Sequence, residues 1–210
     1  MTMQKKLVFT LILTTFYLMG PAQNMRFSTG IEVGPSLISL KENHNYFENP
    51  GIGFSAGIFI QYNAKKIFSL KLAPSFERKG KWDVNHVNLN YFIVPLLFSA
   101  EIGAKTKGFL SVGPYLGYLL EAYTTANYYE GHAGYMQHLN QFDAGISAGL
   151  GIKIPIEQIL CISIELRNNF GLYQIVRSEE SEEYAWYWKT YSTNLLFSLS
   201  YNFGKIQNAL

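Results

Sequence analysis

The chain has 210 residues, which is the length of a single domain, and a formal charge of +2 at neutral pH. Both excess positive charges, Lys5 and Lys6, lie in an N-terminal segment that we expect to be removed, so the mature chain is formally neutral. A neutral chain lacks the basic surface that nucleic-acid binding requires, and this class of partner is excluded.

The first 23 residues have the features of a secretory signal. Lys5 and Lys6 precede an apolar run, Leu7 to Met19, and the small residues of Gly20 to Gln23 follow it. The apolar run is shorter than the ~20 residues of a membrane-spanning helix, which disfavours the alternative of an uncleaved anchor. We therefore predict a cleaved signal peptide over residues 1–23 and one domain over residues 24–210.

From residue 27 onward the sequence alternates between apolar residues and small or polar ones. Successive side chains of a β-strand point to opposite faces, so this period of two predicts strands with one apolar face. Each predicted strand reaches the ~9–11 residues that a tilted membrane-spanning strand needs. The eight predicted strands are 27–40, 51–63, 67–77, 88–102, 108–122, 142–154, 159–172 and 190–203.

The connections between these strands alternate in length. Three are short, over residues 64–66, 103–107 and 155–158. The other four are mostly longer, over residues 41–50, 78–87, 123–141 and 173–189. Outer-membrane barrels have short periplasmic turns and long outer loops. The predicted fold class is all-β, an eight-stranded antiparallel up-and-down transmembrane β-barrel in the bacterial outer membrane, in contact with its lipid.

The polar face of the strands is expected to line the lumen. It is rich in Gly and Ser, as a narrow lumen requires, and it carries charges of both signs that can pair inside a closed barrel. The alternative is a soluble periplasmic ligand-binding barrel with the opposite face inside. The predicted luminal polar network consists of Glu32, Lys71, Glu77, Glu101, Glu121, Asp143, Lys153, Glu165 and Arg167.

Bulky residues share the inward phase with these charges, which predicts a plugged lumen instead of a diffusion pore. They are Phe59, Phe109, Tyr115, Leu119 and Leu196. Four prolines inside the predicted strands cannot donate to a hydrogen-bond ladder. We interpret Gly34-Pro35 and Gly113-Pro114 as candidate β-bulges, and Pro74 and Pro95 as candidate bends.

No catalytic, cofactor-binding or metal-binding residues are predicted. The single cysteine, Cys161, lies in the polar phase of its strand and is expected to be a small lumen-filling residue. An outer-membrane lipid-modifying enzyme is the alternative function, with Ser178, Ser181 or Ser192 beside a loop histidine, but no nucleophile or metal motif supports it. The histidines all fall in or beside the predicted outer loops, at His44, His86, His132 and His138.

Three segments resemble the PorT-like outer-membrane β-barrel proteins: Tyr91–Ser99 (YFIVPLLFS), Gly113–Leu120 (GPYLGYLL) and Phe142–Ile152 (FDAGISAGLGI). The resemblance implies an eight-stranded outer-membrane barrel without catalytic or cofactor residues. The namesake branch of the family assists a protein secretion system. Tyr201 and Phe203 resemble the terminal signal read by the barrel-assembly machinery, although Gly204–Leu210 follow them here.

The sequence thus predicts a non-enzymatic binding or accessory protein of the envelope. Its predicted partners are the barrel-assembly machinery during biogenesis and secretion-system or envelope proteins afterwards. Aromatic residues are enriched at protein interfaces, so the aromatic-rich outer loops are the expected partner surface. The residues assigned to this surface are Tyr128, Tyr129, Tyr184, Trp186 and Trp188.

Overall fold

The structure, a computed structural model, describes residues 27–42, 45–46, 51–64, 67–81, 87–124, 140–157, 159–173 and 188–203. The predicted signal peptide, residues 1–23, lies outside the described residues, as does most of each long connection. Across the described part of the chain, no helix has the length and apolar character to cross a membrane.

The described residues form ten strands, and their bounds follow the alternating pattern closely. They are β1 (Phe27–Glu42), β2 (Asn45–Tyr46), β3 (Gly51–Asn63), β4 (Phe68–Leu72), β5 (Ser75–Lys81), β6 (Val87–Ile102), β7 (Lys107–Thr124), β8 (Phe142–Pro155), β9 (Leu160–Gly171) and β10 (Trp188–Phe203). The predicted strand 67–77 is divided into β4 and β5, and the short strand β2 was not predicted.

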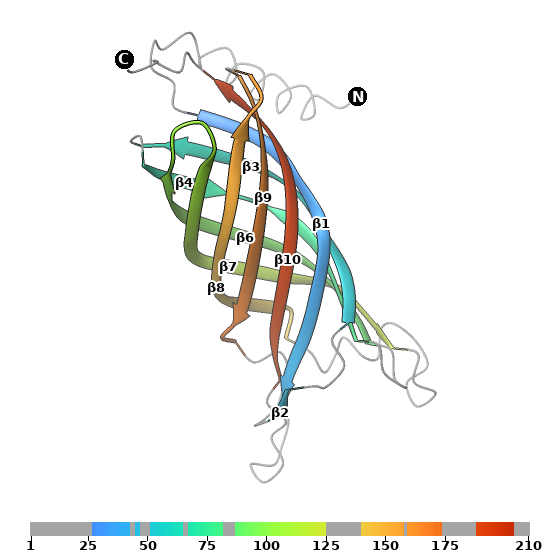
Figure 1. Ribbon diagram of the computed structural model, residues 1–210. Coiled ribbons are helices and arrows are strands. Elements are labelled where there is room, and N and C mark those ends of the chain that lie inside the picture. Colours follow the sequence, from blue (N-terminus) through green and yellow to red (C-terminus); the bar gives the residue numbers. More distant parts are fainter. Residues whose placement is uncertain are drawn as a thin grey trace, which may run out of the picture.

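The strands close into a barrel in which every neighbouring pair is antiparallel (Figure 1). Strand β1 pairs with β10 on one side and with β3 on the other, which closes the sheet. Strands β4 and β5 together form one wall position, because both pair with β3 and β6. The predicted eight-stranded antiparallel barrel is therefore confirmed.

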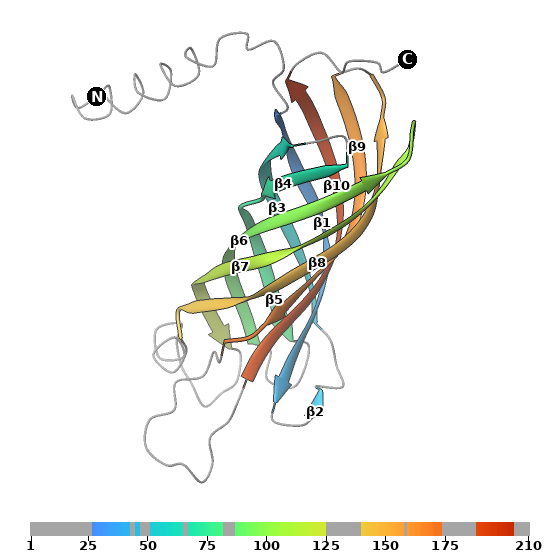
Figure 2. The same cartoon turned by 90° about the vertical axis from the view of Figure 1, so that its left-hand side faces the viewer.

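The strands are strongly staggered around the barrel. The path through directly paired residues starts at Phe27 and returns to β1 at Leu37, ten residues further along the strand. It runs through Tyr62, Leu70, Phe98, Val112, Ala148, Asn168 and Thr193. A stagger of this kind accompanies strands that are tilted to the barrel axis, as Figure 2 shows.

The two ends of the barrel differ. At the end where β1 begins and β10 finishes, the connections are short, over residues 64–67, 103–106 and 156–159 (Figures 1 and 2). We call it the short-turn end and the opposite one the long-connection end. The turn after β6 begins at Gly103, whose φ of 126° is a conformation that suits glycine. In outer-membrane barrels, short turns face the periplasm.

The outer surface of the barrel is apolar. Leu150, at the centre of this surface, is 57% exposed, and Leu110 and Leu166 beside it are exposed as well. A soluble barrel would bury this face, so the soluble ligand-binding alternative is wrong for this chain.

Outward aromatic pairs lie towards both ends of the strands. Phe27 and Tyr62 pack at 5.0 Å between ring centroids near the short-turn end. Tyr118 and Phe142 pack at 5.4 Å near the long-connection end, as do Phe170 and Tyr191 at 6.0 Å. An apolar band between two aromatic girdles is the surface of a membrane-spanning barrel.

The Gly-Pro steps interrupt two hydrogen-bond ladders without shifting them. The β1–β10 ladder omits Gly34 and Pro35 and resumes in the same register, so the predicted bulge is wrong. The β6–β7 ladder does the same at Gly113-Pro114. Each glycine instead permits a close approach of the neighbouring strand, because an added Cβ would collide with the carbonyl oxygen of Leu195 at Gly34 and of Leu96 at Gly113.

Pro74 lies in the break between β4 and β5, as predicted for a bend. Pro95 remains inside β6, where it lies opposite the break and its carbonyl accepts a hydrogen bond from the Ala73 N–H at 3.2 Å. The break therefore coincides with two residues that cannot donate to the ladder.

Candidate functional site in the barrel lumen

Most of the predicted luminal residues do face the lumen. Eight of the nine lie on the inner face, and Glu121 does not. Lys153 is half-buried near the short-turn end. The buried ones are Glu32, Lys71, Glu77, Glu101, Asp143, Glu165 and Arg167.

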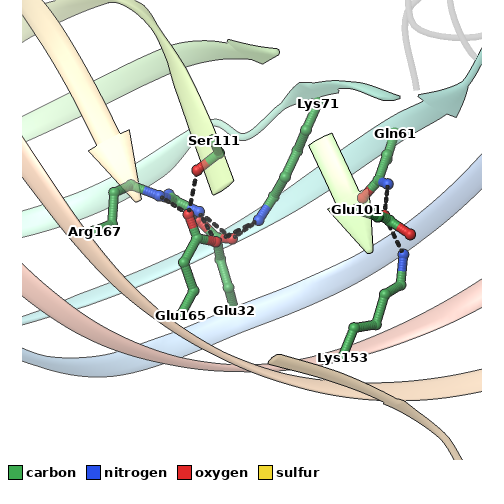
Figure 3. A network of polar contacts seen from close by, with 8 residues as sticks. All are labelled: Glu32, Gln61, Lys71, Glu101, Ser111, Lys153, Glu165 and Arg167. Atoms are coloured by element: carbon green, nitrogen blue, oxygen red, sulfur yellow. Dashed lines mark hydrogen bonds and ion pairs between the residues drawn. The ribbon is translucent and has the colours of Figure 1, made fainter. Parts of the chain in front are cut away.

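Arg167 on β9 lies at the centre of the charged groups and binds two carboxylates (Figure 3). Its Nη1 and Nη2 donate to the two oxygens of Glu32 at 2.7 and 3.0 Å. Its Nε and Nη2 donate to the two oxygens of Glu165 at 3.0 and 2.8 Å. The planar guanidinium matches two carboxylates at once, so this geometry holds all three side chains in fixed positions.

Lys71 on β4 completes this group. Its Nζ lies 2.7 Å from Glu32 Oε2 and 3.2 Å from Glu165 Oε2, and 4.4 Å from the centre of the Phe59 ring. The Ser111 hydroxyl donates to Glu165 Oε1 at 3.2 Å. We call Glu32, Lys71, Glu165 and Arg167 the central network. It is formally neutral, as a buried ionic group must be to offset the cost of losing water.

Glu101 forms a second group nearer the short-turn end (Figure 3). Its oxygens accept from Lys153 at 3.2 Å and from Lys107 at 3.1 Å. The Gln61 amide also donates to it at 3.2 Å and to the Asn63 side chain at 2.8 Å. We call Gln61, Glu101, Lys107 and Lys153 the rim cluster. It carries two lysines for one carboxylate.

Glu77 and Asp143 lie towards the long-connection end, where hydroxyl and amide groups hold them. Glu77 accepts from Asn169 at 3.2 Å and from Ser36 at 3.3 Å. Asp143 accepts from Thr190 at 2.6 Å and from Tyr115 at 3.2 Å. The predicted network is thus divided into separate groups along the lumen.

Apolar side chains close the lumen around these groups. Ala73, Leu97 and Leu196 are 0% exposed beside the central network. Further buried residues follow towards the long-connection end, namely Ile38, Leu89, Tyr91, Ile93, Leu119 and Ala122. Four of the predicted plugging residues, Phe59, Tyr115, Leu119 and Leu196, are buried, and Phe109 is half-buried. An eight-stranded barrel filled in this way leaves no continuous water channel.

Glu121 lies on the outside of the barrel, so its predicted place in the lumen is wrong. The register of the β6–β7 ladder shifts here, because Tyr91 is paired with Leu119 whereas Asn90 is paired with Glu121. The extra residue, Leu120, reverses the alternation beyond it, since a one-residue slip moves every following side chain to the other face. Glu121 accepts a hydrogen bond from the amide nitrogen of the half-buried Asn90 at 3.0 Å.

The chain matches a known protein family over most of its length. The model of the family described as outer membrane protein beta-barrel domain matches residues 21–177. The chain belongs to this family. No curated protein matches it in sequence. Membership, together with the apolar outer face, identifies an outer-membrane protein.

Solved outer-membrane barrels are similar to this chain at low sequence identity, and the first two below share its fold. Neisserial surface protein A is 12% identical with a TM-score of 0.54, covering 84% of this chain and 97% of its own. OprG from Pseudomonas aeruginosa is 9% identical with a TM-score of 0.50, covering 86% and 98%. Ail, the attachment invasion locus protein of Yersinia pestis, is 13% identical with a TM-score of 0.49, covering 85% and 100%.

Several other predicted positions in this outer-membrane barrel can be placed. Ser192 is buried in the lumen and accepts a hydrogen bond from Asn169 at 3.2 Å, so it does not lie at the outer rim as a lipid-modifying enzyme would need. Cys161 is buried on the inner face, with the Asn202 amide 3.2 Å from its sulfur. The described residues hold no group of three or more potential metal ligands.

The predicted partner surface lies almost entirely outside the described residues. Tyr128, Tyr129, Tyr184 and Trp186 lie outside the described residues, and only the backbone of Trp188 is described, as the first residue of β10. His44, His86, His132 and His138 also lie outside them, together with Ser178 and Ser181.

Sequence reasoning missed Asn169, which links three groups in the lumen. It donates to Glu77 and Ser192, and its Oδ1 accepts from Ser147 at 2.6 Å. Asn169 is two residues beyond Arg167 on the same strand, so the period of two would have identified it. Lys107 was missed because the pattern placed the start of its strand one residue later, at residue 108, whereas β7 begins at Lys107.

Proposed function

We propose that this outer-membrane barrel is a non-enzymatic, non-conducting anchor that binds a protein partner at its long-connection end. The observation that supports the proposal is the closed lumen. The central network and the apolar side chains beside it, Leu97 and Leu196, fill the barrel, so transport through it is not its task. Contact with other molecules is left to the ends and to the lipid-facing wall.

The long-connection end is the better candidate of the two ends. Its connections include the two longest of the barrel, residues 125–141 and 172–187, and these contain several aromatic residues. Tyr128, Tyr129, Tyr184, Trp186 and Trp188 supply the large contact area at low entropy cost that protein interfaces favour. Loops on a rigid scaffold commonly carry function, and the ion-paired barrel is such a scaffold.

The first experiment replaces the aromatic residues in groups, Tyr128→Ser with Tyr129→Ser, and Tyr184→Ser with Trp186→Ser. Partner complexes are then captured by cross-linking on intact cells. The proposal expects a cross-linked complex that these variants lose, while the barrel still shows heat-modifiable mobility on gels. The matched control is Thr125→Ala with Gln137→Ala in the same connection, which should keep the complex. A complex unchanged in all variants would reject this surface.

The finer proposal is an accessory role in protein secretion. It is supported by the PorT-like resemblance of segments such as Tyr91–Ser99, whereas family membership alone specifies only the outer-membrane barrel. Its test is the secreted and surface proteome of a deletion strain against its parent. Loss of a defined set of exported proteins, with their accumulation in the periplasm, is the expected result. An unchanged proteome would remove the secretion role and leave the anchor proposal to the cross-linking experiment.

A further inference from the structure

The lumen is not closed evenly along its length. On the inner face of the short-turn half, several polar residues keep a small exposed fraction, with Lys71 7% and Ser99 8% exposed, whereas Ser28 is 0% exposed. Lys153, Ser163 and Asn202 in the same half are only half-buried. We call the polar inner face of the short-turn half the vestibule.

The vestibule ends at the central network. Glu32, Glu165 and Arg167 are at most 2% exposed, and Leu97 and Leu196 beside them have no exposed surface. Beyond this layer, Ser147, Ser192 and Thr190 are as deeply buried, although they are polar. The exposed fraction on the inner face thus falls from 7% at Lys71 to 2% at Arg167.

The vestibule offers mainly hydrogen-bond donors. Two ammonium groups, Lys107 and Lys153, share the single carboxylate of Glu101, which leaves one positive charge unbalanced in the rim cluster. On the inner face of this half, the hydroxyls of Ser69 and Ser198 are each about nine-tenths buried or more and have no hydrogen-bond partner. A buried hydroxyl without a partner is costly, and an acceptor that enters the vestibule would relieve that cost.

We propose that this vestibule is a blind binding pocket for a small anion, a phosphate or carboxylate group, that enters from the short-turn end. The ammonium groups of the rim cluster provide the attraction, and the serine hydroxyls donate to the anion's oxygens. The central network forms the floor and prevents passage to the other side. The pocket does not depend on the proposed partner surface, which lies at the opposite end of the barrel.

The chain contains its own reporter for this pocket. Cys161 is the only cysteine in the sequence and lies at the start of β9, on the inner face of the short-turn half. Its backbone carbonyl accepts a hydrogen bond from Ser200, and Asn202 donates to its sulfur. A small hydrophilic thiol reagent that enters the vestibule should therefore modify Cys161.

The experiment measures the rate at which the hydrophilic thiol reagent modifies Cys161. The protein is the full-length folded barrel, solubilised in a detergent that contains no phosphate group. The proposal expects modification in the folded state and severalfold slowing by inorganic phosphate, with potassium chloride at equal ionic strength as the control. Acetate in place of phosphate distinguishes a general carboxylate site from a phosphate-selective one. Repeating the assay in phosphatidylcholine vesicles tests whether a lipid headgroup already occupies the pocket, which would make added phosphate ineffective there but not in detergent.

Two variants identify where the reagent and the anion lie. In the Lys107→Met, Lys153→Met double variant, Cys161 should still react but phosphate should no longer protect it. In a Cys161→Ser background, Ser147→Cys lies beyond the central network and should react only as the barrel unfolds. Heat-modifiable mobility on gels verifies that each variant is folded.

Three results would overturn the proposal. Cys161 that reacts only after unfolding would show that the vestibule does not admit solutes. Equal slowing by chloride and phosphate would show ionic screening instead of a site. Rapid modification of Ser147→Cys in the folded barrel would show that the lumen is open throughout and has no floor. None of these results bears on the cross-linking test of the partner surface.

Discussion

Arg167 and Glu32 lie 135 positions apart in the chain and meet in two hydrogen bonds of 2.7 and 3.0 Å in the middle of the lumen. They come from β9 and β1, the two strands that flank β10. The registers of β1 and β9 against β10 determine where the two residues lie. The stagger of the closed barrel places both at the same level along the barrel axis. Their contact therefore depends on the register of the closed barrel. Substitutions at these two residues test whether the ion pairs form in the lumen as described.

Replacing Arg167 with Met should destabilise the barrel strongly. It would leave Glu32 and Glu165 with only Lys71 between them, and removing one partner of a buried ion pair costs about 3–5 kcal/mol. The free energy of unfolding is measured by urea titration of the barrel in lipid vesicles. Lys107→Met is the matched control, since this more exposed ion pair should contribute about 1 kcal/mol or less. Equal losses for both variants would contradict a central role for Arg167.

Removing a carboxylate as well should recover part of that loss. In the Glu32→Gln, Arg167→Met double variant, the uncompensated charge on Glu32 is gone while the shape of the lumen is nearly kept. A double-mutant cycle should therefore show a coupling energy of about 0.5–3 kcal/mol, with the double variant more stable than the sum of the singles predicts. Additive losses would mean that the two side chains do not interact in the folded barrel.

The Gly-Pro steps provide a test of wall packing. A methyl group at Gly34 would collide with the Leu195 carbonyl oxygen, whereas at Gly108 the nearest atom, the Ile102 carbonyl oxygen, is 4.0 Å away. Gly34→Ala should therefore cost about 1–3 kcal/mol by overpacking. Gly108→Ala should be neutral or stabilise by up to about 1 kcal/mol, because alanine restricts the unfolded chain. The same urea titration compares them, and a tolerated Gly34→Ala would argue against the close approach of β1 and β10.

Charged substitutions on the outer wall test the orientation of the strands. Leu150 lies midway along its strand on the lipid-facing surface, and Leu150→Arg should destabilise the barrel by about 2–4 kcal/mol in vesicles. Ile154, near the short-turn end of the same strand, lies close to the interface, where arginine costs about 0–1 kcal/mol. The effect requires the folded barrel in lipid, because in concentrated urea without lipid both variants are unfolded and neither arginine faces a membrane. A larger loss at Ile154 would place the membrane elsewhere on the barrel.

The strands and their faces could be predicted from the sequence because alternation has a physical cause in the closed barrel. The bounds of β3, Gly51–Asn63, match the prediction residue for residue, and Glu32, Glu165 and Arg167 lie in the predicted phase. The side of Glu121 could not be predicted, since a bulge depends on how two strands pair and leaves no mark on one strand's pattern. The same holds for the Gly-Pro steps, whose effect is a close approach between strands.

Which charged side chains pair in the lumen could not be predicted from the sequence, for a related reason. Nine charged residues with inward phase can be combined in many ways, and the stagger of the strands decides which of them meet. It places Arg167 against Glu32 and Glu165, and it separates Glu77 and Asp143 from both lysine-bearing groups. The partner surface rests on loop residues and stays a prediction.

The most direct test of the closed lumen is the electrical conductance of the purified full-length barrel in planar lipid bilayers. The structure predicts that the wild-type protein inserts without stable conductance steps, because the central network and Leu97 and Leu196 block the path. The Arg167→Ala, Leu196→Ala double variant, which removes bulk from that layer, should show discrete steps if it folds. Discrete steps of uniform size from the wild-type barrel would contradict the closed lumen and the anchor role built on it.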